Sequence, residues 1–134
     1  MSTFFEENAS RLKDFARMSQ SVGARADYVQ GGGGNTSVKL EGGLMAIKAS
    51  GYCLKDIRPD KAYAVLDYAS LRALYNDNDP AAFEDVEKTG SAKAKEYTKA
   101  IEGLDPLRPS VEVGNFSISI LSLLLTASMI LLFA

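Results

Sequence analysis

The chain has 134 residues, of which 15 are basic and 17 acidic, so its net charge is −2. This length allows one domain with a modest core, and the near-neutral balance argues against a nucleic-acid surface. A single cysteine, Cys53, excludes an intramolecular disulfide framework and suits a reducing, cytoplasmic environment. Histidine is absent, which removes the commonest general base and the commonest zinc ligand.

The first predicted element is an amphipathic helix that begins near residue 2 or 3 and ends before Gly23. Leu12, Phe15 and Met18 recur at spacings of three, with charged residues between them. The residues that precede this pattern are acidic and contain no basic stretch. We therefore do not expect a signal peptide.

A glycine-rich loop follows, because residues 30–37 read Gln-Gly-Gly-Gly-Gly-Asn-Thr-Ser. The glycines allow positive φ angles and a close approach of the backbone to a ligand, and Asn35, Thr36 and Ser37 add polar side chains. Backbone N–H groups around such a bend form a concavity for an anion, most often a phosphate. The loop matches neither a Walker loop nor a Rossmann fingerprint, so a flexible surface loop is the alternative interpretation.

A β-hairpin is predicted next, with strands at 37–40, where apolar and polar residues alternate, and at 44–49, where Met45 and Ile47 share one face. Its turn is expected at Glu41–Gly43, where two glycines favour a tight reversal. A second bend, at Ser50–Gly51, closes the returning strand. Lys48, near the end of that strand, is interpreted as facing water or a ligand phosphate rather than as a Schiff-base nucleophile.

The downstream part is predicted to contain one more strand and three helices. These are a strand at 63–67, a helix at 68–75 with Leu71 and Leu74 inward, a polar turn at 77–80, a helix opened by Pro80 that breaks at 89–91, and a helix at 92–101 that Gly103 ends. Helices and strands therefore interleave, and the fold class is α/β or α+β with one mixed sheet.

The composition changes abruptly at residue 113, after which no charged residue occurs. As a helix, residues 116–134 would rise about 28 Å, close to the thickness of a bilayer core. Five serine and threonine side chains make this stretch only moderately apolar, and the nearest cation is Arg108. A membrane anchor is one interpretation of this tail, but we do not expect a membrane partner.

Three segments in this order resemble the class II aldolase and adducin head family. They read Gly-Gly-Gly-Asn-Thr-Ser-Val-Lys at 32–39, Ile-Lys-Ala-Ser-Gly at 47–51 and Leu-Arg-Pro-Ser-Val-Glu at 107–112. The resemblance covers roughly residues 10–114 and is closest to bacterial relatives of the fuculose- and rhamnulose-phosphate aldolases. It implies a three-layer α/β/α fold with a largely antiparallel central sheet, here incomplete. Residues 1–114 would form this partial domain, and residues 115–134 would be an apolar tail foreign to the family.

The resemblance also implies a reaction: zinc held by three histidines assists the cleavage of a phosphorylated ketose to dihydroxyacetone phosphate and an aldehyde. The implied phosphate-binding residues are Gly34, Asn35, Thr36, Ser50, Gly51 and Ser110. Glu112 matches the carboxylate that exchanges a proton with the substrate carbon next to the carbonyl. Taken alone, Ser50–Gly51 would be interpreted as an ordinary turn and Glu112 as a solvated surface acid. The order of the three segments along the chain favours the phosphate-binding and catalytic interpretation instead.

The sequence departs from the family pattern after Glu112. The family places a Phe-His pair and then a His-x-His after this glutamate, whereas the corresponding window at 131–133 reads Leu-Leu-Phe. We therefore expect no zinc to bind this chain and no lyase activity from it as written. A shift of reading frame near residues 114–115 is the preferred explanation, and a fusion to a tail anchor is the alternative.

The expected partner is thus phosphate or a phosphorylated sugar, and neither nucleic acid nor a membrane. Family enzymes are often homotetramers, but the sequence does not define the oligomeric state or the sugar. A non-enzymatic binding module of the adducin-head type is the alternative function, since such a module needs no zinc ligands.

Overall fold

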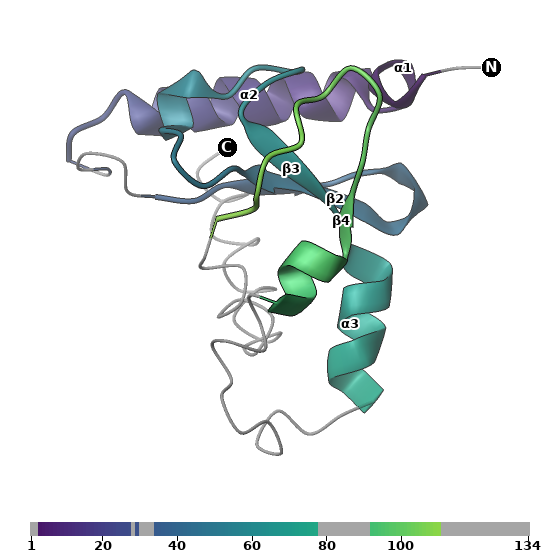
Figure 1. Ribbon diagram of the computed structural model, residues 1–134. Helices are drawn as coiled ribbons and strands as arrows, with labels where there is room; N and C mark the ends of the chain where they lie inside the picture. Colours follow the sequence, from purple (N-terminus) through teal and green to yellow (C-terminus); the bar gives the residue numbers. More distant parts are fainter. Residues whose placement is uncertain (1–2, 28, 30–33, 78–91, 111–134) are drawn as a thin grey trace.

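The computed structural model describes residues 3–27, 29, 34–77 and 92–110. Two helices, α1 (Phe4–Glu7) and α2 (Ala9–Gly23), precede the strands β1 (Ser37–Lys39) and β2 (Leu44–Lys48), which the 3-10 turn η1 (Glu41–Gly43) connects. The elements η2 (Leu54–Asp56), β3 (Tyr63–Asp67), α3 (Tyr68–Asp77), helical residues 92–96 and β4 (Thr98–Lys99) follow (Figure 1). The hairpin and the strand at 63–67 are therefore confirmed.

The four strands form an antiparallel sheet in the order β1-β2-β3-β4. Val38 lies opposite Ala46, and Ala46 lies opposite Val65 in the next strand. Each strand pairs with its neighbour in the chain. The connection from β1 to β2 is the short turn η1, whereas the one from β3 to β4 runs through residues 68–97 and includes α3.

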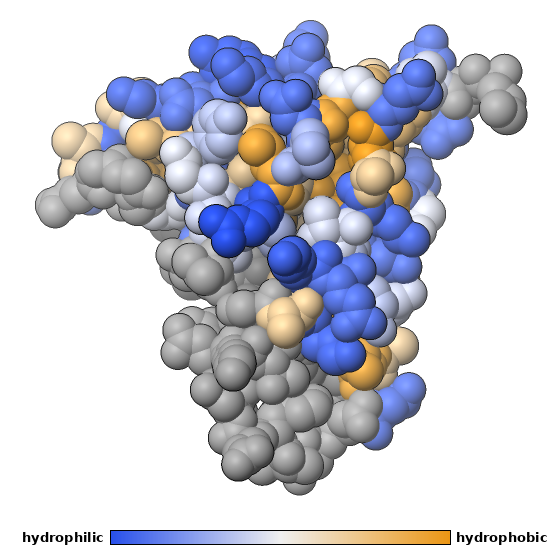
Figure 2. All heavy atoms as spheres, viewed as in Figure 1, coloured by the Kyte–Doolittle hydropathy of each residue, from blue (hydrophilic) through white to orange (hydrophobic). Residues whose placement is uncertain are grey.

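Each face of the sheet carries its own apolar core. On one face, α2 packs with Leu12, Phe15, Ala16, Ala46 and Val65 among the buried residues. Figure 2 shows hydrophobic residues gathered beneath the hydrophilic outer surface of this part of the molecule. On the other face, the buried residues are Met45, Ile47, Leu66 and Ala94. Helices thus lie on both sides of the strands in Figure 1, which agrees with the predicted α/β class in incomplete form.

Phe15 and Tyr63 occupy the centre of the core beneath α2. Their rings meet edge to face with centroids 5.8 Å apart, and both side chains are fully buried. The Tyr63 hydroxyl donates a hydrogen bond of 2.7 Å to the Pro59 carbonyl. Burial, with a smaller contribution from the charge of Asp60, raises the pKa of Tyr63. This ring therefore acts as a buried neutral group that is satisfied by one backbone acceptor.

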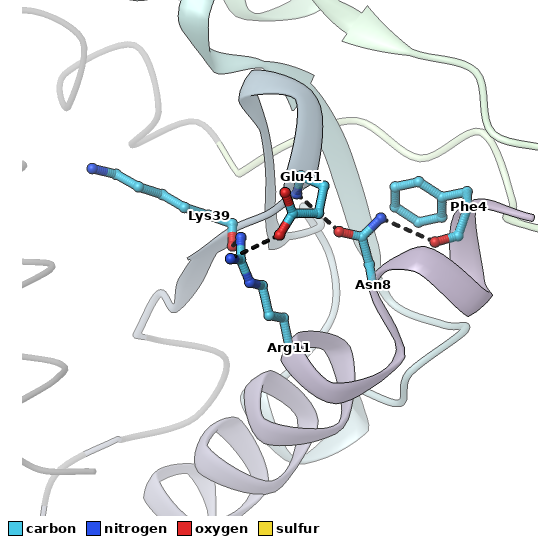
Figure 3. Close-up of polar contacts among 5 residues, drawn as sticks. All are labelled: Phe4, Asn8, Arg11, Lys39 and Glu41. Carbon is cyan, nitrogen blue, oxygen red and sulfur yellow. Dashed lines mark hydrogen bonds and ion pairs between the residues drawn. The ribbon is translucent and has the colours of Figure 1, made fainter. Parts of the chain in front are cut away.

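The predicted single N-terminal helix is wrong at Asn8, where α1 ends and α2 begins. The buried Asn8 amide donates 3.0 Å to the Phe4 carbonyl and accepts 3.0 Å from the Glu41 N–H (Figure 3). Arg11 adds an ion pair of 2.9 Å with Glu41 and a hydrogen bond of 3.3 Å to the Lys39 carbonyl. A short amide side chain such as that of Asn8 competes for backbone hydrogen bonds and can interrupt a helix. Here it connects the two helices to the turn of the hairpin.

The predicted helix at 92–101 is also wrong in its second half. The helical residues end at 96, and Thr98–Lys99 pair with β3 instead. The Thr98 hydroxyl donates 2.8 Å to the Ala94 carbonyl, and the Asp67 N–H donates 2.9 Å to the Tyr97 carbonyl. The open edge of β3 needs backbone partners, and this requirement outweighs the local helical pattern.

Several predictions lie outside the described residues. They include most of the turn at 77–80, the helix opened by Pro80, the break at 89–91 and the apolar tail at 115–134. Within the described ranges, the structure has no helix that is both long enough and apolar enough to cross a bilayer.

Candidate anion-binding site

The segments that carry the resemblance meet at Lys48, the last residue of β2. Its N–H donates 3.2 Å to the carbonyl of Thr36, which comes directly before β1. Its carbonyl accepts 3.1 Å from the N–H of Ser110. The glycine loop and the Pro-Ser segment therefore bond the backbone of one lysine, although they are far apart in the sequence.

The Pro-Ser segment pairs with the chain that follows β2, on the same side of β2 as β1 and beyond Ser37, the first residue of β1. Pro109 lies opposite Ala49 in an antiparallel bridge, and the Ser50 N–H donates 2.9 Å to the Arg108 carbonyl. The structure thus brings Ser50 next to the segment that ends in Ser110. Glu112 is two positions further along the chain and lies outside the described residues.

Ser50 and Gly51 occupy the centre of a tight turn, closed by a 3.4 Å hydrogen bond from the Tyr52 N–H to the Ala49 carbonyl. Gly51 has φ +87°, the left-handed conformation that type II turns require at this position. A Cβ at Gly51 would meet no atom within 4 Å, so its backbone is open on that side. Within the described part of the chain, neither the Gly51 N–H nor the Ser50 hydroxyl makes a hydrogen bond.

Gly34, at the end of the glycine run, has φ +85°. A Cβ here would lie 3.0 Å from Leu54 Cδ1 and 3.3 Å from a methyl group of Val29. This glycine therefore allows a close approach of the loop to the protein's own side chains. The three glycines before it lie outside the described residues.

Asn35, which directly follows the glycine run, carries an unpaired polar atom. Its Oδ1 is buried and has no hydrogen-bond partner within the described residues. A half-turn of the amide would exchange Oδ1 and Nδ2 and leave a buried donor unpaired instead. Buried polar atoms are nearly always satisfied, so this amide is suited to a bound group that the protein alone does not supply.

Thr36 faces the core and not the loop. Its side chain is 4% exposed, and its Oγ1 lies 2.6 Å from the hydroxyl of Ser19, which donates 2.6 Å to the Phe15 carbonyl. The predicted phosphate contact of Thr36 could therefore involve only its backbone. Ser19 was missed by the sequence analysis, although it is a polar residue at core spacing from Phe15 on α2.

The Lys48 side chain is 4% exposed, so the predicted water-facing position is wrong. Its ammonium donates 2.9 Å to the Tyr52 carbonyl and 3.3 Å to the Ala49 carbonyl. These acceptors are the two ends of the Ser50–Gly51 turn. Hydroxyl and amide donors above a buried cation form an arrangement that attracts anions.

The residues present do not fit the zinc ion that the family implies. The chain contains no histidine, and its one cysteine, Cys53, is half-buried. Among the residues that the structure describes, no three histidine, cysteine, aspartate or glutamate side chains are grouped to hold a metal ion. Catalytic zinc requires three protein ligands, commonly with several imidazoles, and this set does not supply them.

Comparison with protein-family models matches residues 13–114 to the Class II Aldolase and Adducin N-terminal domain. No curated protein and no solved structure matches the chain. The matched range covers well over half of the sequence and includes all three converging segments. The chain therefore belongs to the class II aldolase and adducin N-terminal domain family.

Proposed function

We propose that this chain binds phosphate or a phosphorylated sugar and does not carry out zinc-dependent aldol cleavage. The observation that carries this proposal is the convergence of the three family segments on Lys48. Because the segments converge, one edge of the sheet carries Asn35, the Ser50–Gly51 turn and Ser110.

The chemistry of this edge suits a phosphoryl group. A phosphate presents several acceptor oxygens and at least one negative charge, which N–H and O–H donors bind strongly. The unbonded Gly51 N–H and Ser50 hydroxyl provide such donors. The Asn35 side chain provides another once a half-turn of its amide places Nδ2 where the unpaired Oδ1 lies. The buried ammonium of Lys48 adds positive charge beneath the turn.

The cleavage step is a separate matter from phosphate binding. The family reaction needs a Lewis acid to stabilise the negative charge that develops on the substrate oxygen. Glu112 could move a proton at the substrate carbon, but the chain supplies no imidazole to hold the metal ion beside it. Binding without cleavage is therefore the function that these residues support.

A titration of the full chain with inorganic phosphate and with dihydroxyacetone phosphate, followed by ¹⁵N NMR, tests this proposal. We expect the largest shifts at the amides of Asn35 and Gly51. Asn35→Ala should weaken binding by about tenfold or more, because a hydrogen bond to a charged group is lost. Asn76→Ala is the matched control, since Asn76 is exposed on α3 and far along the chain from these segments.

Two results would count against the proposal. Shifts that are absent from the loop and the turn would favour the non-enzymatic adducin-type module instead. Equal affinities for Asn35→Ala and Asn76→Ala would show that the anion binds elsewhere.

A further inference from the structure

We infer that Lys48 is a positioning residue of the anion site, which aims the Ser50–Gly51 turn at the ligand and makes the site prefer dianions to monoanions. The inference rests on the proposed function, because it requires an anion at this edge of the sheet. It assigns a role to Lys48, the one buried cation among the described residues, which neither the family reaction nor the sequence pattern explains.

The position of Lys48 is fixed from both its backbone and its side chain. Its N–H and carbonyl bond Thr36 and Ser110, and its ammonium bonds the carbonyls of Ala49 and Tyr52. A lysine held in this way has little freedom to move toward a substrate. Its ammonium is also held by two carbonyl acceptors, which favour the charged form and argue against a mobile nucleophile.

The ammonium shapes the turn because its two acceptors flank it. One carbonyl precedes Ser50 and the other follows Gly51, and both are drawn toward the interior. Ser50 and Gly51 themselves are exposed, whereas Ala49 is fully buried. The free donors of the turn are therefore held on the outer side, where a ligand can reach them.

The charge of Lys48 has no counter-ion within the described residues. The ion pairs of this part of the chain join Arg11 with Glu41, Arg17 with Asp14, Arg25 with Asp27, Lys93 with Glu96 and Lys99 with Asp67. The Asp56 carboxylate, further along the chain, accepts from the Cys53 N–H. A buried, uncompensated ammonium is costly, so a ligand with more negative charge gains more from binding beside it.

Methyl phosphate and methyl sulfate test this inference, because both have a tetrahedral head with one methyl ester. At pH 8 methyl phosphate is a dianion, since its second pKa is about 6, and methyl sulfate carries one charge. We expect the wild-type chain to bind methyl phosphate about tenfold more tightly, the effect of one additional charge near a fixed cation. The affinities are measured by NMR titration of the full chain.

The variants separate charge from structure. Lys48→Met and Lys48→Gln remove the charge and should bring the two affinities within about twofold of each other, whereas Lys48→Arg should keep the preference for the dianion. Lys13→Met is the matched control, because Lys13 is exposed on α2. A variant that only disturbs the fold would weaken both ligands alike and leave their ratio unchanged.

Each outcome has a distinct meaning. If the wild-type chain binds neither ester, the proposed function itself fails. If it binds both equally, or if a folded neutral variant at position 48 keeps the wild-type ratio, the role of Lys48 is overturned while phosphate binding stands. Circular dichroism identifies the variants that fold. If neither neutral variant folds, the ratio of the wild-type affinities for methyl phosphate and methyl sulfate still tests the expected preference for the dianion.

Discussion

At the residue scale, one buried hydroxyl pair holds the end of the glycine loop against α2. Ser19 is 0% exposed, and its hydroxyl is shared between Thr36 Oγ1 and the Phe15 carbonyl. Removing it would leave the Thr36 hydroxyl buried without a partner. We therefore expect Ser19→Ala to lower the free energy of unfolding by about 1–3 kcal/mol.

Urea unfolding of Ser19→Ala and of the control Ser21→Ala measures this effect. Ser21 is exposed on the same helix, so its replacement should change stability by less than about 0.5 kcal/mol. Equal stabilities for the two variants would mean that the Ser19–Thr36 pair contributes nothing. A loss of phosphate affinity in Ser19→Ala alone would show in addition that the pair positions the loop.

The sequence named segments that the structure joins at Lys48, but not the direction of their side chains. Local motifs and the resemblance identified the segments that contain Asn35, Ser50 and Gly51, and backbone hydrogen bonds at Lys48 and Ser50 join these segments. The inward directions of Thr36 and Lys48 depend on strand register, where a shift of one residue reverses the face. Register is set by partners far along the chain, so no short pattern contains it.

At the scale of elements, Asp67 joins β3 to α3. Its carboxylate accepts 3.1 Å from the Ser70 N–H and 2.8 Å from the Ser70 hydroxyl, as an N-cap residue does. These two hydrogen bonds, and more weakly the charge of Lys99, lower the pKa of Asp67 against the opposing effect of burial. The cap therefore stabilises the protein only while the carboxylate is ionised.

Asp67→Ala should cost about 1 kcal/mol at pH 7, the usual value of such a cap. Because the pKa of the folded protein is lowered, the contribution is complete above the ordinary value of 3.8 and disappears as pH falls through the folded-state pKa. Urea unfolding at pH 7 and pH 3 measures the difference from wild type, which should shrink at the lower pH. A difference that stays constant would contradict the cap, and the exposed Asp105→Ala serves as the control.

Elements were predictable where local patterns and tertiary needs agree. The hairpin, the strand at 63–67 and the start of α3 follow from alternation and turn residues. The break at Asn8 and the strand at Thr98–Lys99 do not, because each is set by backbone groups elsewhere: the Glu41 N–H and the open edge of β3. Tertiary contacts decided these two cases.

At the scale of the whole molecule, the resemblance predicted more than periodicity could. Periodicity predicted interleaved helices and strands, but the joining of Thr36 and Ser110 at Lys48 depends on pairing between residues far apart in the sequence. The family match over residues 13–114 supports the expected fold class. The same comparison makes the lack of histidine informative, because it identifies the chemistry that the chain would need.

The last prediction concerns that chemistry. With added Zn²⁺, the full chain should release no dihydroxyacetone phosphate from phosphorylated ketoses, because it offers no imidazole ligands and one half-buried thiol. A coupled reduction of dihydroxyacetone phosphate by NADH measures the reaction, with an active class II aldolase as the positive control. Zinc-dependent turnover that Glu112→Gln abolishes would show that carboxylates suffice for the metal, and the proposed separation of binding from cleavage would be wrong. Phosphate binding without turnover would instead show that the anion site works independently of the zinc that the resemblance implies.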